Sequence, residues 1–587
     1  MTNQWSDGAQ TVEKINLPSI TVSEMTFSDG TLVELNPDDI VVLVGPNNAG
    51  KSATLREIES LLGKHANPCR VITEIRMAKS GTLNDLEAAF EAHSYKAYHN
   101  GNLHYRGSGY DIPARQLSSG WESRFELLRN FFCRRLKTES RILDSNPAPS
   151  FKVLTEPASM PIQMLYANSE IEERISGYFR TAFNCDLIVM KAGGNEIPLL
   201  VGERVPLEER EDPTQKSYLE RLMKKTTPLQ EQGDGMRSFA SVILEMLANQ
   251  APSMLLLDEP EAFLHPPQAR LLGEFLARER RGNAQLFIAT HSPDVLTGLL
   301  SEAPEQLRVI RIQRDGDRNR VKELQKEKAK AIAADPLMKY SAVLSGIFHE
   351  RAIICEADAD CMFYQALLAQ PSVHVGAHPD VLFLHASGKH RMATMGEALR
   401  ALGVPVDVIA DVDLLKEKNS FQKLVIALGG DWALVEPLWN TIKLAIESRK
   451  SWFNADAVIK EIRDKLDEIG GRGEEFPEAA ANDIRSTLKK SSPWGAVKDA
   501  GDAAIPSGDP TQRLNKLRAY LESIGIWIVP VGELEGFCRS IGGHGPKWVQ
   551  RVIEDRELSS DPELEEARNF IKAIWSRNPT FDSDASA

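Results

Sequence analysis

The sequence predicts an α/β protein with at least two domains, in which parallel strands alternate with helices. Three observations predict this class. The 587 residues are too many for one hydrophobic core. Short apolar runs typical of buried strands recur in both halves, followed by stretches with helical periodicity. Several of these runs end in glycine or acidic residues, and sites in parallel sheets lie at the carboxyl ends of the strands.

Composition describes a globular chain, with 42% hydrophobic and 26% charged residues. No window holds the roughly eighteen uninterrupted apolar residues of a membrane helix, and residues 1–18 lack the apolar centre of a signal peptide. We therefore expect a cytoplasmic protein without a membrane partner. Six scattered cysteines favour a reducing compartment and argue against structural zinc. The net charge of −14 excludes a broad basic coat, although a local basic track can still bind nucleic acid.

The first chemical signature follows a predicted hairpin within residues 19–35. The apolar run Val41–Val44 enters a G-x4-G-K-S motif, which is typical of a phosphate-binding loop. Its glycines let successive N–H groups point at one anion at the start of a helix. Lys51 is expected to reach the β- and γ-phosphates, and the Ser52 hydroxyl to ligate Mg²⁺. The alternative reading is an ordinary glycine turn. The residues expected to bind ATP here are Gly45, Asn47, Asn48, Gly50, Lys51, Ser52 and Ala53.

From about residue 65 to residue 227 the hydrophobic pattern loosens. Arg124–Leu136 and Glu170–Phe183 have helical periodicity, but the remainder shows no steady period. We interpret this stretch as a partly helical insertion in the nucleotide-binding domain, and as a candidate dimerisation or substrate arm. Gln163 is a candidate for a glutamine that senses the nucleotide.

Three further elements complete the nucleotide site. Gln232–Ser238 places small residues before a helix, a position that suits an anion, although an ordinary helix cap is the alternative. Met254–Glu259 is a buried strand that ends in two acids. Asp258 is expected to hold Mg²⁺, and Glu259 to orient the attacking water. His291, at the end of a later strand, can contact the γ-phosphate, although a lone histidine is more often structural.

These motifs, in this order, resemble the ABC-type ATPase head shared by SMC, RecF-like and OLD-family proteins. The resemblance implies that ATP binding pairs two heads, so that a homodimer or a higher oligomer is expected. It also implies that the glycine motif of one protomer covers ATP held by the other. The residues that would act in this way are Gly233, Asp234, Gly235 and Ser238.

A second set of strands begins after a charged connector, and we place the domain boundary at about residue 345. The strands Arg351–Glu356, Val381–His385, Val406–Asp411 and Ile526–Val531 alternate with helical stretches. Acids follow three of them. In an extended chain the side chains of Asp411 and Asp413 point the same way, so both can face one metal.

Carboxylates that gather at one sheet edge are what Mg²⁺ or Mn²⁺ requires. The expected metal ligands at this edge are Glu356, Asp411, Asp413, Glu533 and Glu535. We expect Glu356, Asp411, Asp413 and Glu535 to be catalytic, because bound ions can activate water for phosphodiester cleavage. Glu259 is the expected catalytic residue for ATP hydrolysis. Lys547 is expected to neutralise charge on the scissile phosphate. The alternative is that these acids only cap helices.

This second pattern resembles the Toprim domain of topoisomerases, primases and OLD nucleases. The usual Glu-Gly-x-x-Asp sequence is here Glu356-Ala-Asp-Ala-Asp360, with alanine at the glycine position. The resemblance implies that Asp360 is a further metal ligand. Long helical stretches from about 415 to 520 are interpreted as an insertion within this domain of residues 346–575. The polar tail 576–587 is expected to be disordered.

An ABC-type ATPase joined to a Toprim domain resembles the OLD family of ATP-dependent nucleases. The resemblance implies an ATP-gated, metal-dependent DNA endonuclease of bacterial antiphage defence. A defence-system partner protein or a retron ribonucleoprotein is a further expected partner. The alternative is an ATP-switched DNA clamp or sensor whose Toprim domain is inert or only binds metal. A topoisomerase ranks last, because no tyrosine stands in a recognisable nucleophile context.

Overall fold

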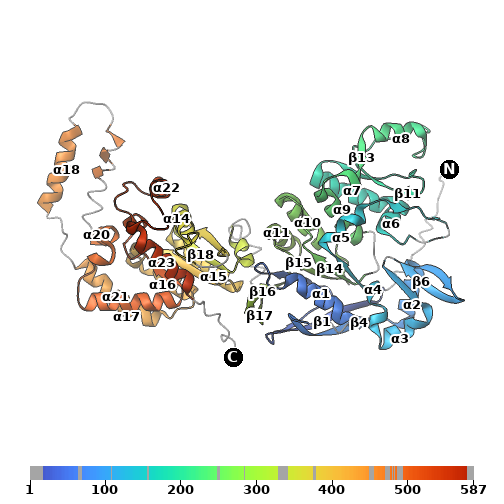
Figure 1. The fold of residues 1–587 in the computed structure, drawn as a ribbon, viewed down its shortest axis with the longest axis horizontal. Coiled ribbons are helices and arrows are strands. Elements are labelled where there is room, and N and C mark those ends of the chain that lie inside the picture. The colour runs from blue at the N-terminus through green and yellow to red at the C-terminus, as the bar shows by residue number, and fades with distance from the viewer. Residues whose placement is uncertain are drawn as a thin grey trace, which may run out of the picture. The chain divides into compact units, whose positions relative to one another are not determined.

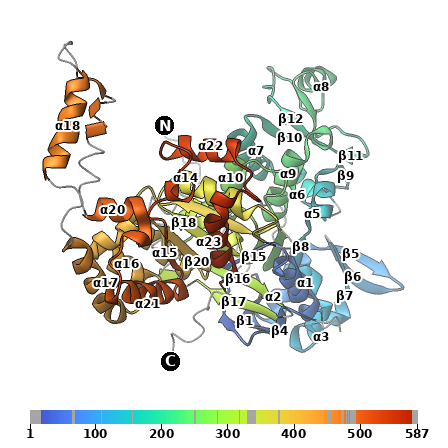
Figure 2. The ribbon, with the colours of Figure 1, turned by 60° about the vertical axis from the view of Figure 1, so that its left-hand side comes forward.

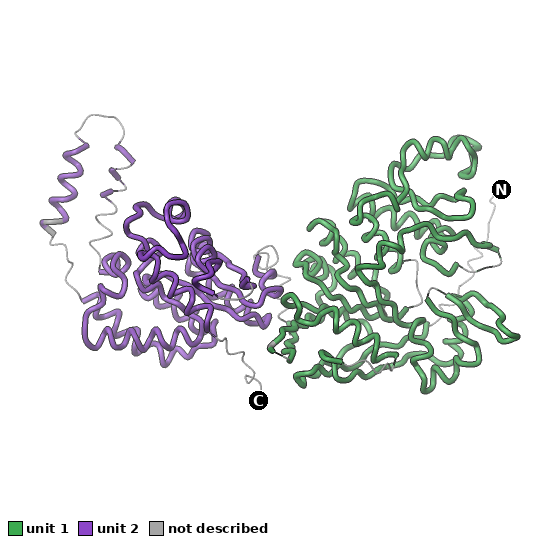
Figure 3. The backbone as a smooth tube through the Cα atoms, in the orientation of Figure 1, with its two compact units in different colours: residues 1–339 green, residues 340–587 purple. Residues whose placement is uncertain are grey.

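The computed structural model describes most of the chain. The described residues are 17–63, 69–107, 109–154, 156, 158–247, 252–282, 284–316, 318–324, 326–327, 342–374, 378–448, 455–469, 476–478, 480–481, 483–484 and 493–577. The chain divides into two compact units, residues 1–339 and 340–587, which are coloured separately in Figure 3. The sequence predicts this boundary at about residue 345, close to the observed one.

The centre of the first unit is a six-stranded sheet with the order β17-β16-β3-β15-β14-β8 (Figure 1). Only β17 is antiparallel to its neighbour. The strands are β3 (Ile40–Val44), β8 (Cys133–Leu136), β14 (Met254–Asp258), β15 (Gln285–Ala289), β16 (Leu307–Asp315) and β17 (Arg318–Glu323). All five residues of β3 are buried, as expected for a central parallel strand whose two faces are covered. The α/β class is confirmed.

Helices follow the strands of this sheet, as in other α/β folds. Those that bear on the nucleotide site are α1 (Lys51–Leu62), α9 (Asp234–Leu247), α10 (Pro266–Arg278) and α11 (Pro293–Glu302). The apolar face of α1, with Leu55, Ile58 and Leu62, packs in one buried cluster with Val41 and Leu43 of β3. The phosphate-binding motif is therefore held between a core strand and a core helix.

The stretch 65–227 is not a single insertion. Its strand β8 lies at the edge of the central sheet beside β14, and its strand β4 (Ile72–Ser80) pairs with β1 (Ser19–Phe27), which also pairs with β2 (Leu32–Glu34). The helix expected over Arg124–Leu136 is only a short helix, α4 (Arg129–Phe132), that passes into β8. Pairing with the buried strand β14 explains why helical periodicity failed there.

The remainder of this stretch forms smaller pieces. A three-stranded antiparallel sheet is built from β5 (Tyr95–His99), β6 (Asn102–Gly107) and β7 (Tyr110–Pro113), and another from β10 (Asp186–Val189), β12 (Leu199–Gly202) and β13 (Thr226–Pro228). The pair β9–β11 joins Ala148–Pro149 to Glu196–Ile197. The helices are α2 (Leu83–His93), α3 (Leu117–Glu122), α5 (Thr138–Arg141), α6 (Pro161–Ala167), α7 (Ser169–Phe183) and α8 (Lys216–Met223). The predicted helix over Glu170–Phe183 is observed as α7.

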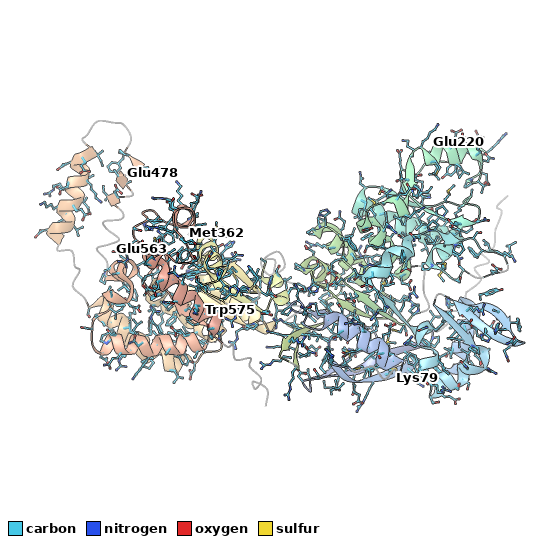
Figure 4. All side chains as sticks on the ribbon, viewed as in Figure 1. Lys79, Glu220, Met362, Glu478, Glu563 and Trp575 are labelled. Carbon is cyan, nitrogen blue, oxygen red and sulfur yellow. The ribbon has the colours of Figure 1, made fainter. Side chains whose placement is uncertain are left out.

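The second unit contains a four-stranded parallel sheet with the order β19-β18-β20-β21. Its strands are β18 (Arg351–Cys355), β19 (Val381–His385), β20 (Val406–Ala410) and β21 (Ile526–Ile528). Since all four are parallel, their carboxyl ends share one edge. The helices α14 (Asp358–Leu368), α22 (Pro546–Asp555) and α23 (Glu565–Ser576) cover one face, where Ile353 and Ile409 are buried with them. In Figure 4, Met362 marks α14 and Trp575 marks α23.

The opposite side of this sheet carries α15 (Lys389–Ala401), where a Cβ at Gly396 would lie 3.9 Å from Cδ1 of Ile354. The segment between β20 and β21 holds the expected helices, and Figure 2 shows several of them from a second direction. They are α16 (Lys418–Ala427), α17 (Trp432–Glu447), α18 (Ala455–Ile469), α20 (Pro493–Ala500) and α21 (Asp509–Ser523). Helix α23 extends to Ser576, and most of the predicted disordered tail lies outside the described residues.

No helix in the described ranges is both long enough and apolar enough to cross a membrane.

Candidate functional site

The phosphate-binding motif has the backbone that an anion cradle needs. Gly45, directly after β3, has φ +137°, and a Cβ there would lie 2.0 Å from the carbonyl oxygen of Ile312 on β16. Gly50 has φ +103° and caps α1. Both positions therefore require glycine, one because of a close backbone approach and both because of their conformation. Asn47 and Asn48 between them are exposed, and Ala53 lies in the first turn of α1.

The lysine and serine of the motif occupy the positions that ATP and Mg²⁺ chemistry requires. Lys51 is buried, and its Nζ donates to the carbonyl oxygens of Gly45 and Pro46, each at 2.7 Å. Ser52 Oγ donates to Asp258 Oδ1 at 2.8 Å. These two candidate Mg²⁺ ligands are 206 residues apart along the chain. They lie close together in space because only β15 separates β3 from β14 in the sheet. The residues present fit a nucleotide with its magnesium ion.

Glu259 and His291 face each other at the ends of β14 and β15. Their closest atoms, Glu259 Oε1 and His291 Nε2, are 3.4 Å apart. Burial, and then the charge of Lys51, lower the pKa of His291 to about 4, so the imidazole is neutral at physiological pH. Glu259 has φ +45°, an uncommon conformation for a residue with a side chain.

Arg141 is a component of this site that sequence reasoning missed. It lies at the end of α5, just beyond β8, and is fully buried. Its guanidinium donates to Ser238 Oγ at 3.0 Å, to the carbonyl of Asp258 at 3.1 Å and to the carbonyl of Glu259 at 2.9 Å. Arg141 therefore fixes the strained backbone at Glu259 and ties it to α9. No local motif marks this arginine, because its partners are 97 to 118 residues away.

The glycine motif lies at the start of α9, as predicted. Gly233 has open space around its Cα, whereas Gly235 packs against the carbonyl of Phe263, and the side chain of Asp234 is about half exposed. Gly233 and Asp234 are therefore accessible at the surface of the first unit.

Two predictions about this domain need correction. Ser238 is fully buried in the second turn of α9, where it accepts from Arg141, so it cannot reach ATP on a partner. Gln163 is also buried: its Oε1 accepts from the N–H groups of Ser159 and Met160, so it caps α6 and does not sense a nucleotide.

The second cluster lies at the carboxyl edge of the sheet in the second unit. Glu356 follows β18, and Asp411 and Asp413 follow β20. Their carboxylates offer one oxygen each within 4.8 Å of one another. Glu356 Oε2 is buried and has no hydrogen-bond partner within the described part of the chain. Three converging carboxylates with a buried, unpartnered oxygen fit a divalent cation with oxygen ligands.

The pair Asp411 and Asp413 converges for a different reason from the one expected. β20 ends at Ala410, and Val412–Lys416 is a 3₁₀ helix, so the two acids do not share one face of an extended strand. The turn brings both carboxylates towards Glu356 instead. The two-residue spacing was informative, but the strand geometry assumed for it was wrong.

Glu533 and Glu535 form a second group with His544, again with one ligand atom from each within 4.8 Å. Here the oxygens have partners: Glu535 Oε1 accepts from the N–H of Gly545 at 2.7 Å and lies 3.5 Å from His544 Nδ1. His544 was not predicted, since it follows two glycines in a loop without periodicity.

Asp360 lies outside both groups. Its Oδ2 accepts from the N–H of Ala357 at 2.9 Å, so it caps α14, which is the alternative role considered for these acids. Ala357 has an extended backbone with φ −127°, so alanine at the usual glycine position causes no strain.

The cations near these acids are not the predicted one. Lys547 is exposed in the first turn of α22, and it makes no ion pair with a described carboxylate. Lys389 Nζ lies 2.6 Å from Asp413 Oδ1. Lys498, on α20, lies 3.4 Å from Asp411 Oδ2, 3.8 Å from Asp413 Oδ2 and 3.3 Å from Glu533 Oε2. Both lysines were missed, because one follows a strand loop and the other belongs to the inserted helices.

The pKa values of the acids in this cluster show that their charged forms are destabilised. Burial raises the pKa of Glu356, of Glu533 and, most strongly, of Asp411. The neighbouring carboxylates raise these pKa values further, whereas Lys498 lowers them. A bound cation would relieve this repulsion.

Part of the chain is similar to known proteins. Residues 169–297 match a family model described as "AAA domain, putative AbiEii toxin, Type IV TA system". The matched region contains the glycine motif, Asp258, Glu259 and His291. The chain is also 22% identical over 173 residues to the Old nuclease of Escherichia phage P2. The resemblance to the OLD family is confirmed. The match covers 29% of this chain and 29% of the OLD nuclease, so the chain spans less than a third of that relative's length.

Solved structures that are similar to this chain include SMC heads. The SMC head domain from Thermotoga maritima is 12% identical, with 53% of this chain and 99% of that chain covered and a TM-score of 0.28. The SMC head bound to the C-winged helix domain of ScpA gives 12% identity, 53% and 99% coverage and a TM-score of 0.34. TM-scores this low carry no argument, and the fold class rests on the sheets described above.

Proposed function

We propose that the chain is an ATP-gated, divalent-metal-dependent DNA endonuclease, with an ABC-type ATPase head in the first unit and a Toprim nuclease domain in the second. The observation that carries the proposal is the convergence of Glu356, Asp411 and Asp413 at one sheet edge. The similarity to a phage nuclease and the AAA domain match support the pairing of an ATPase with a nuclease. Antiphage defence is the biological role that we propose with it.

The residues of the second unit suggest how cleavage would proceed. Glu356, Asp411 and Asp413 would hold Mg²⁺ or Mn²⁺, with Glu533 and Glu535 at the adjoining strand end. A divalent ion supplies positive charge for the departing oxygen and makes water a better nucleophile. Burial raises the pKa of Glu356, and a cation bound beside it would favour the ionised carboxylate that a metal ligand needs. Lys389, beside Asp413, would steady that carboxylate.

The first unit would supply the gate. Lys51, Ser52 and Asp258 would hold ATP and its magnesium ion, and Glu259 would orient the attacking water. Gly233 and Asp234 would close over ATP held by a second copy, so that nucleotide binding pairs two heads. A homodimer is the smallest assembly that this proposal allows, and a defence-system protein or retron ribonucleoprotein is a further candidate partner.

A specific observation favours the second candidate, an ATP-switched DNA clamp or sensor. The carboxylates of Asp411, Asp413 and Glu533 already have lysine partners within the protein. An acidic cluster neutralised by its own lysines can be structural and need not hold a metal ion.

A plasmid cleavage assay separates the two candidates. Supercoiled plasmid is incubated with the wild-type protein, Glu356→Ala and Glu554→Ala, with Mg²⁺ or Mn²⁺ and with or without ATP. Glu554 is an exposed acid on α22 in the same unit and serves as the matched control. The endonuclease proposal expects nicked or linear DNA with wild type and Glu554→Ala, and at least a hundredfold less with Glu356→Ala. Retarded but intact DNA under every condition would select the clamp.

A further inference from the structure

We propose that Glu261 is a positioning residue for ATP hydrolysis, and that it holds His291 in place opposite Glu259. The inference rests on the proposed function and deepens it, because it assigns a further residue to the nucleotide site of the first unit. The carboxylate of Glu261 contacts the chain directly after β15, where His291 lies. Glu261 would therefore act through His291 and not on ATP itself.

One oxygen of Glu261 accepts hydrogen bonds from two consecutive residues after β15. The Thr290 hydroxyl donates to Glu261 Oε1 at 2.7 Å, and the backbone N–H of His291 donates to the same oxygen at 2.9 Å. The Thr290 hydroxyl also accepts from the N–H of Ser292 at 2.9 Å. Because Thr290 is fully buried, removal of the Glu261 carboxylate would leave a buried donor without its acceptor. The backbone that carries the His291 ring is thus tied to Glu261.

A second link joins the same two strand ends in the opposite direction. The backbone N–H of Glu259, after β14, donates to the carbonyl of Ala289, the last residue of β15, at 2.8 Å. The chain after β14 is therefore bonded to β15, and the chain after β15 is bonded to Glu261. Together these links hold Glu259 Oε1 and His291 Nε2 at their separation of 3.4 Å.

The other oxygen of Glu261 indicates that the position needs an acceptor and not a charge. Glu261 Oε2 is buried and has no hydrogen-bond partner in the part of the chain that the structure describes. Burial raises the pKa of Glu261, although the bonds from Thr290 and His291 oppose this shift. Glutamine keeps an acceptor oxygen on a side chain of the same length without the charge. It should therefore replace Glu261, whereas leucine should not.

Steady-state ATP hydrolysis by the full-length protein tests the inference, at temperatures below the unfolding transition of each variant. In Glu261→Leu we expect kcat to fall by about tenfold or more, because a displaced His291 no longer faces Glu259. The KM for ATP should change by less than about twofold, since Lys51 and Ser52 are untouched. Glu261→Gln should restore kcat to within about twofold of wild type. A residue that only stabilises the fold would lower Tm and leave kcat of the folded protein unchanged.

Glu170→Leu, at an exposed acid on α7 of the same unit, is the matched control and should hydrolyse ATP at the wild-type rate. If circular dichroism shows that Glu261→Leu does not fold, Thr290→Val takes its place, because it removes one donor to Glu261 and keeps the shape of the side chain. The same fall in kcat at an unchanged KM is then expected.

The outcomes are distinguishable. A wild-type kcat in the folded variant that lacks the contact, or a higher KM at an unchanged kcat, would overturn the inference and leave the proposed ATPase standing. An equal loss of kcat in Glu261→Gln and Glu261→Leu would also overturn it, because the charge and not the acceptor would then matter. If the wild-type protein does not hydrolyse ATP, the proposed ATP gate itself is contradicted.

Discussion

Replacing Arg141 by methionine should damage both the stability and the ATPase of the first unit. The substitution keeps an unbranched side chain of similar length but removes three hydrogen bonds, to Ser238 Oγ and to the carbonyls of Asp258 and Glu259. Both carbonyls keep another donor, from the Thr138 hydroxyl and the Ala262 N–H respectively. Each lost bond therefore costs about 1 kcal/mol, the low end of the usual range, for a total of about 3 kcal/mol.

The assay is thermal unfolding together with ATP hydrolysis. For a unit of 339 residues, about 3 kcal/mol corresponds to a fall in Tm of roughly 4 °C. Because Glu259 stands at φ +45° with its carbonyl held by Arg141, we also expect kcat for ATP to fall at least tenfold. If Arg141→Met is folded at low temperature but still hydrolyses ATP slowly, then the loss of rate comes from the position of Glu259 and not from unfolding.

Arg180→Met is the matched control. Arg180 pairs with Glu173 and Asp186 at the surface, where its side chain is 46% exposed. Surface ion pairs of this kind contribute at most about 1 kcal/mol. If Arg141→Met lowers Tm no further than Arg180→Met and hydrolyses ATP at the wild-type rate, then Arg141 does not support Glu259 and the reasoning is refuted.

Three further predictions concern the nucleotide site. Lys51→Ala should lose ATP turnover by at least a hundredfold in a phosphate-release assay; normal hydrolysis would mean that the G-x4-G-K-S loop does not bind the nucleotide. Glu259→Gln should retain ATP and shift the protein to a larger species in size-exclusion chromatography with ATP, and an unchanged elution would count against head pairing. The third concerns pH. The pKa of His291 is lowered from 6.5 to about 4, so the unfolded chain takes up this proton first as the pH falls. The contribution of His291 is therefore present above pH 6.5 and is lost towards pH 4. Between pH 7 and pH 5, the Tm of His291→Gln should thus fall by less than the Tm of the wild-type protein. Equal falls in Tm would show that the pKa of His291 is not lowered by folding.

Sequence patterns predicted those parts of the structure that are written in consecutive residues. The run Val41–Ser52 combines an apolar strand, two glycines and a helix start, and the structure has all three in place. Acids directly after strands were also found reliably, because parallel strands bring their carboxyl ends to one edge whatever lies between them. Glu356, Asp411 and Asp413 meet for this reason although 55 residues separate the first two along the chain.

Partners that depend on tertiary packing could not be predicted in this way. Arg141 belongs to a short helix, Lys389 begins α15 and Lys498 belongs to an inserted helix, and none of them lies in a motif. The sequence of β8 has helical periodicity, but its pairing with β14 makes it a strand. Ser238 and Asp360 were assigned to sites by resemblance to known families, and the structure gives both of them hydrogen-bonding roles within the chain instead.

The helices between β20 and β21 have a practical consequence for protein engineering. Because α20 delivers Lys498 to the acids, a shortened chimera that joins the strands by a brief linker would not be a neutral scaffold. In such a chimera the carboxylates of Asp411 and Glu533 would lack the positive charge of Lys498. A segment grafted from another protein would need its own basic residue at the position of Lys498. Exchanging this segment between related proteins is therefore expected to change the net charge around the acids as well as the shape of the recipient domain.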